Sequence, residues 1–220
     1  MNSQIIEQIL VGIGETFYMV VFSTFFAYLF GVPVGIILNI TDSNGILPNR
    51  PLNLFVGFIT NIIRSVPFLI LLVTILPFTR FIVGTTIGST ATIVPLVVAA
   101  APFVARMVES SLKEVDNGVI EAAKAMGSSP WQIIRKVLLA EARPSLLVGG
   151  VIAFVTILGY SAMAGFVGGG GLGAIAVNYG YYRYKYDVML VTVAILVIIV
   201  QVFQEVGLHL VNKSDRRLRN

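Results

Sequence analysis

Charged residues divide the chain into long apolar intervals, and these intervals are the dominant pattern in the sequence. A charged side chain at the centre of a bilayer costs about 2.5–3.5 kcal/mol on insertion scales, so a charge-free interval of about 17 residues or more is a candidate transmembrane helix. Four such intervals occur, at residues 16–41, 81–105, 144–182 and 188–204. A fifth apolar segment, residues 54–77, is interrupted only by Arg64. The pattern predicts an all-α, polytopic integral membrane protein with five transmembrane helices.

The spans predicted from these intervals cover residues 16–41, 54–77, 85–107, 145–167 and 187–209 of a single domain, residues 1–220. The interval 144–182 is too long for one span. Its second part starts with Gly168–Gly171, which favours a sharp turn, and continues into a tyrosine-rich stretch typical of a membrane interface. We therefore expect an outer loop after residue 167.

A separate short helix is expected ahead of the first span. Isoleucine and leucine occupy positions 5, 6, 9, 10 and 13, a spacing that puts them on one helical face. An amphipathic helix of this kind typically lies flat in the membrane interface. We place it on the outer side, before residue 16.

The composition agrees with a membrane protein and excludes several other classes. Apolar residues make up 56% of the chain and charged residues 12%, about half the ~25% of a soluble domain. The sequence contains no cysteine and one histidine, which excludes a disulfide framework, a thiol nucleophile and Cys-ligated metal, and leaves few ligands for any metal site. We expect no catalytic residues and no metal in this chain.

The basic residues are distributed unevenly between the two sides of the predicted spans. Eleven of the fifteen Lys and Arg lie on one side: Arg50, Arg106, Lys113, Lys124, Arg135, Lys136, Arg143, Lys213, Arg216, Arg217 and Arg219. The positive-inside rule places that side in the cytoplasm, so the N-terminus is outside and the C-terminus is cytoplasmic. The net charge of +4 thus follows topology, and a nucleic-acid partner is not expected. Five spans enclose a pathway poorly on their own, which favours a homodimer in the lipid bilayer.

The predicted cytoplasmic loop, residues 108–143, is longer than neighbouring helices need and contains signals for two helices. Asp116 is a good N-cap residue, and Gly127 stands where a C-terminal left-handed residue belongs. Ser129 and Gln132 have the spacing of a capping box around Pro130 and open a second helix that should end near residue 143. A helix, a glycine elbow and a helix would project into the cytoplasm. Such an element either docks on a partner or folds back on its own spans.

The same loop resembles a known family. Glu121-Ala122-Ala123, three further residues and then Gly127 are similar to the EAA loop of bacterial ABC-importer permeases. Ala140 stands where the general pattern has proline, which affects the end of the second helix. The likeness extends over roughly residues 12–209 and is closest to the methionine-import permeases. It rests on Arg64-Ser65-Val66-Pro67-Phe68, on Gly168–Gly173, on Tyr179-Gly180-Tyr181 and on Asp187-Val188-Met189.

The resemblance implies a role and a set of partners. The loop would be the coupling helix that docks in a groove of a cytoplasmic ATP-binding subunit, with contacts from Glu121, Ala122, Ala123, Met126, Gly127 and Trp131. The complex would be a homodimer of this permease with two ATP-binding subunits and an external solute-binding protein, located in the bacterial cytoplasmic membrane. ATP and Mg would be bound by the partner subunit, and this chain would hold no cofactor. The transported solute would be methionine.

Two absences bear on how transport would be powered. The chain has no Gly-Lys dipeptide, which a P-loop requires, so any ATP must be bound by another polypeptide. The predicted spans have no acidic residue at mid-depth, which disfavours sodium or proton coupling. The alternatives are a permease for another amino acid or small metabolite, an ion-coupled secondary amino-acid carrier, a channel, and a membrane anchor that moves no solute.

Arg64 is the one charge that hydropathy leaves inside a predicted span, and two interpretations are open. Pro67 favours a helix start or kink nearby, and the guanidinium would then extend to the cytoplasmic headgroups. Alternatively, Arg64 lines the substrate pathway and attracts the carboxylate of an amino acid in transit.

Overall fold

The computed structural model describes residues 3–214, and every regular element in this range is a helix. The predicted all-α class is therefore confirmed. The first half contains α1 (Ser3–Ile40), α2 (Arg50–Ser65), α3 (Phe68–Thr74), α4 (Leu76–Val83) and α5 (Ser89–Lys113). The middle contains α6 (Asn117–Ala125), α7 (Pro130–Gln132), the π-helix η1 (Ile133–Leu138) and α8 (Leu139–Glu141). The last part contains α9 (Arg143–Ala164), the 3₁₀ turn η2 (Gly165–Val167), α10 (Gly171–Ile175), the π-helix η3 (Ala176–Tyr181) and α11 (Tyr186–Ser214).

Four helical segments of the described chain are long and apolar enough to cross a membrane. They are α1, α5, the run Arg143–Tyr181 that starts with α9, and the part of α11 up to Val211. A fifth crossing exists only if α2 and α3 count as one span, and these two helices are bent by 102°. The span predicted over residues 54–77 is thus broken at Val66–Pro67, at the proline that the sequence indicated as a helix start or kink. Proline lacks an N–H and disfavours helical geometry in the residue before it, which explains the position of the break.

The separate interfacial helix expected before residue 16 is wrong, because α1 continues through this region without a break. The prediction ended the span at the charge of Glu15. In the structure, the backbone N–H of Gly171 donates to the Glu15 carboxylate at 2.6 Å, and the N–H of Leu172 donates to the Thr16 hydroxyl at 2.9 Å. The Glu15 carboxylate therefore has a hydrogen-bond partner on α10, which packs against α1, and α1 can continue through this position.

The centre of the bundle is the contact between α1 and α5, the most extensive helix pair. Gly31 and Gly35, one turn apart on α1, lie against Val104 and Val108 of α5. A Cβ on Gly35 would lie 2.5 Å from the carbonyl oxygen of Ala105. Small residues at this spacing let two helix backbones approach closely, as in many membrane helix pairs.

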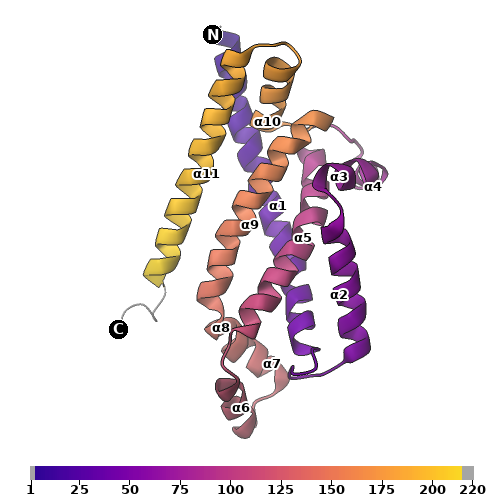
Figure 1. Ribbon diagram of the computed structural model, residues 1–220, viewed down its shortest axis with the longest axis vertical. Coiled ribbons are helices and arrows are strands. Elements are labelled where there is room, and N and C mark those ends of the chain that lie inside the picture. Colours follow the sequence, from indigo (N-terminus) through magenta and orange to yellow (C-terminus); the bar gives the residue numbers. More distant parts are fainter. Residues whose placement is uncertain (1–2, 215–220) are drawn as a thin grey trace.

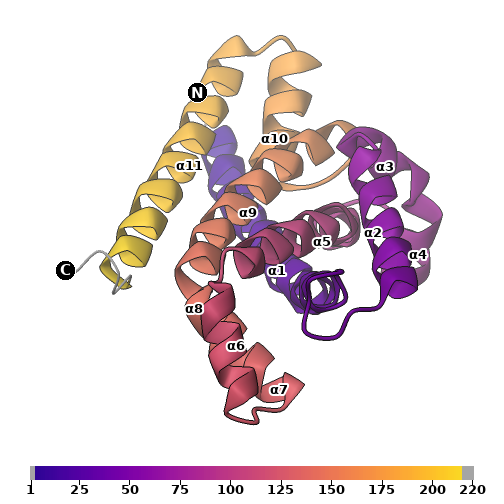
Figure 2. The ribbon, with the colours of Figure 1, turned by 60° about the horizontal axis from the view of Figure 1, so that its bottom comes forward.

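The other helices flank this pair and leave the middle segment at one end. Figure 1 shows α2, α3 and α4 on one side of α5, and α9, α10 and α11 on the other. Helices α6, α7 and α8 project beyond the bundle in both views (Figures 1 and 2), at the end opposite to the start of α1. The outer loop expected after residue 167 is also largely helical, because α10 and η3 fold back beside α11. The orientation in the bilayer stays a prediction, and the basic residues Arg216, Arg217 and Arg219 lie outside the described residues.

Candidate functional site

The projecting segment begins with the capped helix α6. The Asp116 side chain accepts a hydrogen bond from the N–H of Gly118 at 2.6 Å, which satisfies the helix start. At the other end Gly127 has φ +76°, and its N–H donates to the carbonyl of Lys124 at 2.9 Å. The N–H of Ser128 donates to the carbonyl of Ala123 at 3.1 Å, which completes a Schellman motif. Both predicted boundaries of this helix are confirmed.

The second half of the segment opens with the predicted capping box. The N–H of Ser129 donates to the Gln132 side chain at 2.8 Å, and the N–H of Gln132 donates back to the Ser129 hydroxyl at 3.4 Å. The helix then widens into η1 and ends with α8 at Glu141, slightly before the predicted residue 143. Arg143 instead begins α9, with Pro144 in the first turn, where proline is well tolerated.

Burial separates two faces of this segment, which we call the elbow (residues 117–141). Ile133, Ile134 and Leu138 are buried against the bundle, so one face does fold back on the chain's own helices. Ala123 is only 3% exposed and belongs to this inner face. Ala123, which was predicted to contact a partner, packs the inner face of the elbow against the bundle in this structure.

The outward face of the elbow carries large apolar side chains that are mostly exposed. Met126 is 78% exposed and Trp131 is 67% exposed. Glu121, Ala122 and Gly127 are exposed beside them. We call these five residues the elbow surface. Exposed tryptophan and methionine are typical of the buried centres of protein–protein interfaces, so this surface is suited to docking a partner.

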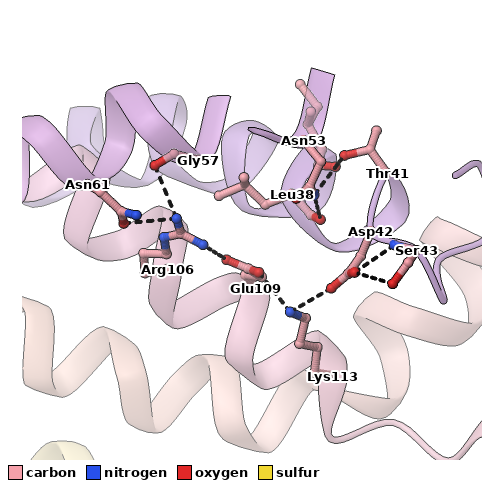
Figure 3. Close-up of polar contacts among 11 residues, drawn as sticks. Leu38, Thr41, Asp42, Ser43, Asn53, Gly57, Asn61, Arg106, Glu109 and Lys113 are labelled. Carbon is pink, nitrogen blue, oxygen red and sulfur yellow. Dashed lines mark hydrogen bonds and ion pairs between the residues drawn. The ribbon is translucent and has the colours of Figure 1, made fainter. Parts of the chain in front are cut away.

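An ion-pair chain joins the root of the elbow to the first half of the protein (Figure 3). The Lys113 ammonium at the end of α5 lies 2.8 Å from the Asp42 carboxylate and 2.9 Å from the carboxylate of Glu109. Glu109 also accepts from Arg106 at 2.6 Å. The hydrogen bond from Lys113 lowers the pKa of Asp42, which lies in the turn after α1. The last turns of α5 are thus fastened to the α1–α2 turn directly above the elbow.

Hydrogen bonds extend this network to α2. Arg106 donates to the Asn61 side chain at 2.9 Å and to the carbonyl of Gly57 at 3.2 Å. Asn53 donates to the carbonyl of Leu38 at 2.7 Å. Sequence reasoning missed this network, although Arg106, Glu109 and Lys113 have the i, i+3 and i+4 spacings of helix ion pairs. Their partners on α2 and in the α1–α2 turn are distant in sequence and carry no local signal.

Arg64 lies in the last turn of α2, far from the elbow. It is 14 residues beyond Arg50, or about 21 Å along a helix that starts at the elbow end. Arg64 lines a cavity of about 150 Å³ at the junction of α2, α3, α5 and α9. Both interpretations of Arg64, contact with the cytoplasmic headgroups and a place on the substrate pathway, stay predictions.

The described residues do not suggest a metal centre. Within residues 3–214, no group of three or more His, Cys, Asp or Glu side chains is placed to hold a metal ion. The geometry offers an exposed surface on the elbow, whose root is joined to the bundle by ion pairs, and a cavity within the bundle that Arg64 lines.

The sequence of this chain is similar to those of known transport proteins. A family model described as binding-protein-dependent transport system inner membrane component matches residues 31–220. The probable D-methionine transport system permease protein MetI of Vibrio cholerae is 50% identical over 211 residues, which cover 96% of this chain and 94% of that protein. The D-methionine transport system permease protein MetI of Escherichia coli K12 is 53% identical over 154 residues, covering 70% and 71% of the two chains.

Solved structures show the same arrangement of helices. A chain of the inward-facing MetNI methionine ABC transporter superposes with a TM-score of 0.96 at 48% identity, covering 98% of this chain and all of that one. A chain of an amino acid ABC transporter crystallised with histidines gives a TM-score of 0.78 at 20% identity, which shows a shared fold.

Proposed function

This chain belongs to the family of binding-protein-dependent transport system inner membrane components, and from that membership we propose that it is the transmembrane permease subunit of an ATP-driven ABC importer of methionine. The relatives named for D-methionine transport match at about half of all positions over most of the chain. That degree of similarity supports methionine over another amino acid or small metabolite as the solute.

The working complex is a homodimer of this permease with two cytoplasmic ATP-binding subunits and an external solute-binding protein. The matched MetNI structure is itself a methionine ABC transporter, which supports this composition. The permease has no Gly-Lys pair for a P-loop, so ATP and Mg are bound and ATP is hydrolysed by the partner subunits. The permease contributes conformational change and no catalytic residue.

The elbow surface is the contact with the ATP-binding subunit, and its exposed Trp131 and Met126 are the observation that carries this assignment. Glu121, Ala122 and Gly127 complete the contact. Because the Lys113–Asp42 pair and its neighbours fasten the elbow root to α1 and α2, a movement of the elbow is transmitted to the helices as a rigid body. ATP binding, which brings the two ATP-binding subunits together, then turns the pathway outward, and hydrolysis resets it. ATP and loaded binding protein must each favour the outward state differentially, since a ligand with equal affinity for both states shifts nothing.

Arg64 is placed on the substrate pathway in this proposal. Its guanidinium is exposed and belongs to the second predicted span, where a charge is costly unless it faces water, a partner or an anionic solute. An amino acid in transit supplies a carboxylate for it.

Reconstitution tests the function as a whole. The permease, its ATP-binding subunit and its binding protein are placed in proteoliposomes, and uptake of labelled methionine is followed with competing amino acids. We expect ATP-dependent accumulation that unlabelled methionine competes best. Uptake that needs no ATPase and follows an ion gradient would instead establish a secondary carrier, and stronger competition by another solute would reassign the substrate.

A double variant tests the elbow surface. Met126→Ser with Trp131→Ala removes the exposed apolar side chains without touching the buried face of the elbow. Aromatic anchors of interfaces typically contribute about 2 kcal/mol or more, so we expect the affinity for the ATP-binding subunit to fall about tenfold or more. Phe81→Ala, which removes an 87% exposed ring from α4 far from the elbow, is the matched control. Normal association and normal pumping by the double variant would show that the elbow docks differently.

A further inference from the structure

The cavity beside Arg64 has walls of two kinds. Arg64 is exposed, whereas Phe68 is only 7% exposed. The rings of Phe68 and Tyr160 stack with centroids 4.6 Å apart and planes 4° from parallel, which joins α3 to α9. Ala99 and Phe103 of α5 contribute the third wall. The cavity thus presents a cation on its outer side and aromatic and aliphatic surface inside.

Arg64 has no partner of its own. Among residues 3–214, its side chain makes no hydrogen bond or ion pair, and the salt bridges of this part of the chain join Arg106, Glu109, Lys113 and Asp42. Arg106, the other arginine beside α2, donates to Glu109, Asn61 and Gly57 and is already satisfied. A guanidinium offers a planar fork that matches a carboxylate with two parallel hydrogen bonds. Arg64 is therefore the arginine of this region that is available to a carboxylate ligand.

The cavity has the size and chemistry for a small apolar side chain. A protein cavity of about 150 Å³ is known to hold benzene, and the side chain of methionine is smaller than benzene. A thioether sulfur also makes favourable contacts with aromatic rings. The cavity disfavours a cationic side chain, because Arg64 lines it and no anionic residue does.

We propose that Arg64 and the aromatic walls of Phe68, Phe103 and Tyr160 form a binding site inside the permease for a zwitterionic amino acid with an unbranched apolar side chain. This inference rests on the proposed function and names methionine as the ligand. Arg64 binds the carboxylate, and the aromatic walls receive the thioether. The permease then selects its solute itself, in addition to any selection by the binding protein.

Equilibrium binding of labelled methionine to the purified permease–ATPase complex, without binding protein, tests the site. Methionine amide, which lacks the carboxylate, serves as the competing probe. We expect Arg64→Gln to weaken methionine binding about tenfold or more, as for loss of a charged hydrogen bond, and to leave the affinity for methionine amide nearly unchanged. Arg64→Lys should retain part of the affinity. Arg80→Gln is the matched control, because Arg80 on α4 is also exposed and unpaired among the described residues but lies outside the cavity.

A cavity-filling variant, Phe103→Trp, tests the apolar part. It should weaken methionine and methionine amide alike, with unchanged gel-filtration behaviour. Absence of saturable methionine binding by the wild-type complex would overturn the site, and so would equal weakening of both ligands by Arg64→Gln. ATP-dependent methionine accumulation by wild-type proteoliposomes is measured in parallel. If accumulation is present and binding fails, the site alone is wrong; if accumulation is absent, the proposed function is wrong.

Discussion

Replacing Gly127 by alanine perturbs the elbow through the backbone alone. Gly127 has φ +76°, and a Cβ built on it has no atom within 4 Å. Steric crowding therefore contributes nothing, and the cost is that of a left-handed conformation in an L-residue, about 1–2 kcal/mol. A free elbow relieves this strain by unwinding the last turn of α6, whereas docking requires the bent form. The strain should consequently appear as a loss of docking affinity.

The expected loss is about 5- to 30-fold, which is what one or two kcal/mol produces in an equilibrium. Titration of the ATP-binding subunit onto the permease in nanodiscs measures it, and hydrogen exchange of α6 shows whether the helix end unwinds. Gly84→Ala is the matched control, because Gly84 has φ +83° and an equally open Cβ position but ends α4. Wild-type affinity in Gly127→Ala, or an equal loss in Gly84→Ala, would refute the reasoning that the bent elbow is the docking form.

Three further outcomes are expected. Gly35→Val should lower thermal stability by about 1–3 kcal/mol in detergent, because its Cβ meets a backbone oxygen of α5 at 2.5 Å, whereas Gly14→Val, with open space around it, should not. The lowered pKa of Asp42 means that its pairing with Lys113 stabilises the fold above the ordinary carboxyl range and is lost as pH falls through the lowered value. Thermal unfolding below about pH 4 should therefore show a loss of stability that is absent in Asp42→Asn. Ser129→Ala removes half of the capping box and should cost about 1 kcal/mol, measured by hydrogen exchange at the start of α7.

The elbow could be predicted from the sequence because its signals act over a few residues. Three local signals determine the helix ends: the N-cap Asp116, the left-handed Gly127 and the Ser129–Gln132 pair. Their hydrogen bonds join residues two to five positions apart in the sequence. Composition and the gaps between charges likewise predicted the all-α class. Capping signals depend on local backbone geometry, and the gaps between charges reflect the apolar environment of the helices. Both can be recognised in a single sequence.

The features that the sequence did not predict have a different cause, which is contact between segments that are distant in the sequence. The gap between charges ended the first span at Glu15, but its partner Gly171 is 156 residues away. Arg106 finds Asn61 across 45 residues, and Ala123 faces inward because the elbow folds onto the bundle. Pro67 signalled a helix start or kink, but no local rule supplies the 102° angle between α2 and α3.

The length of α1 has a consequence for the surrounding lipid. Its 38 residues extend about 57 Å, nearly twice the ~30 Å of a bilayer's hydrocarbon core. Hydrogen bonds at Glu15 and Thr16 and close packing at Gly31 and Gly35 prevent this helix from sliding along its neighbours. A thicker or thinner membrane must then be met by deforming the lipid around the protein or by tilting the whole bundle, so hydrophobic mismatch acts on the transporter as one unit.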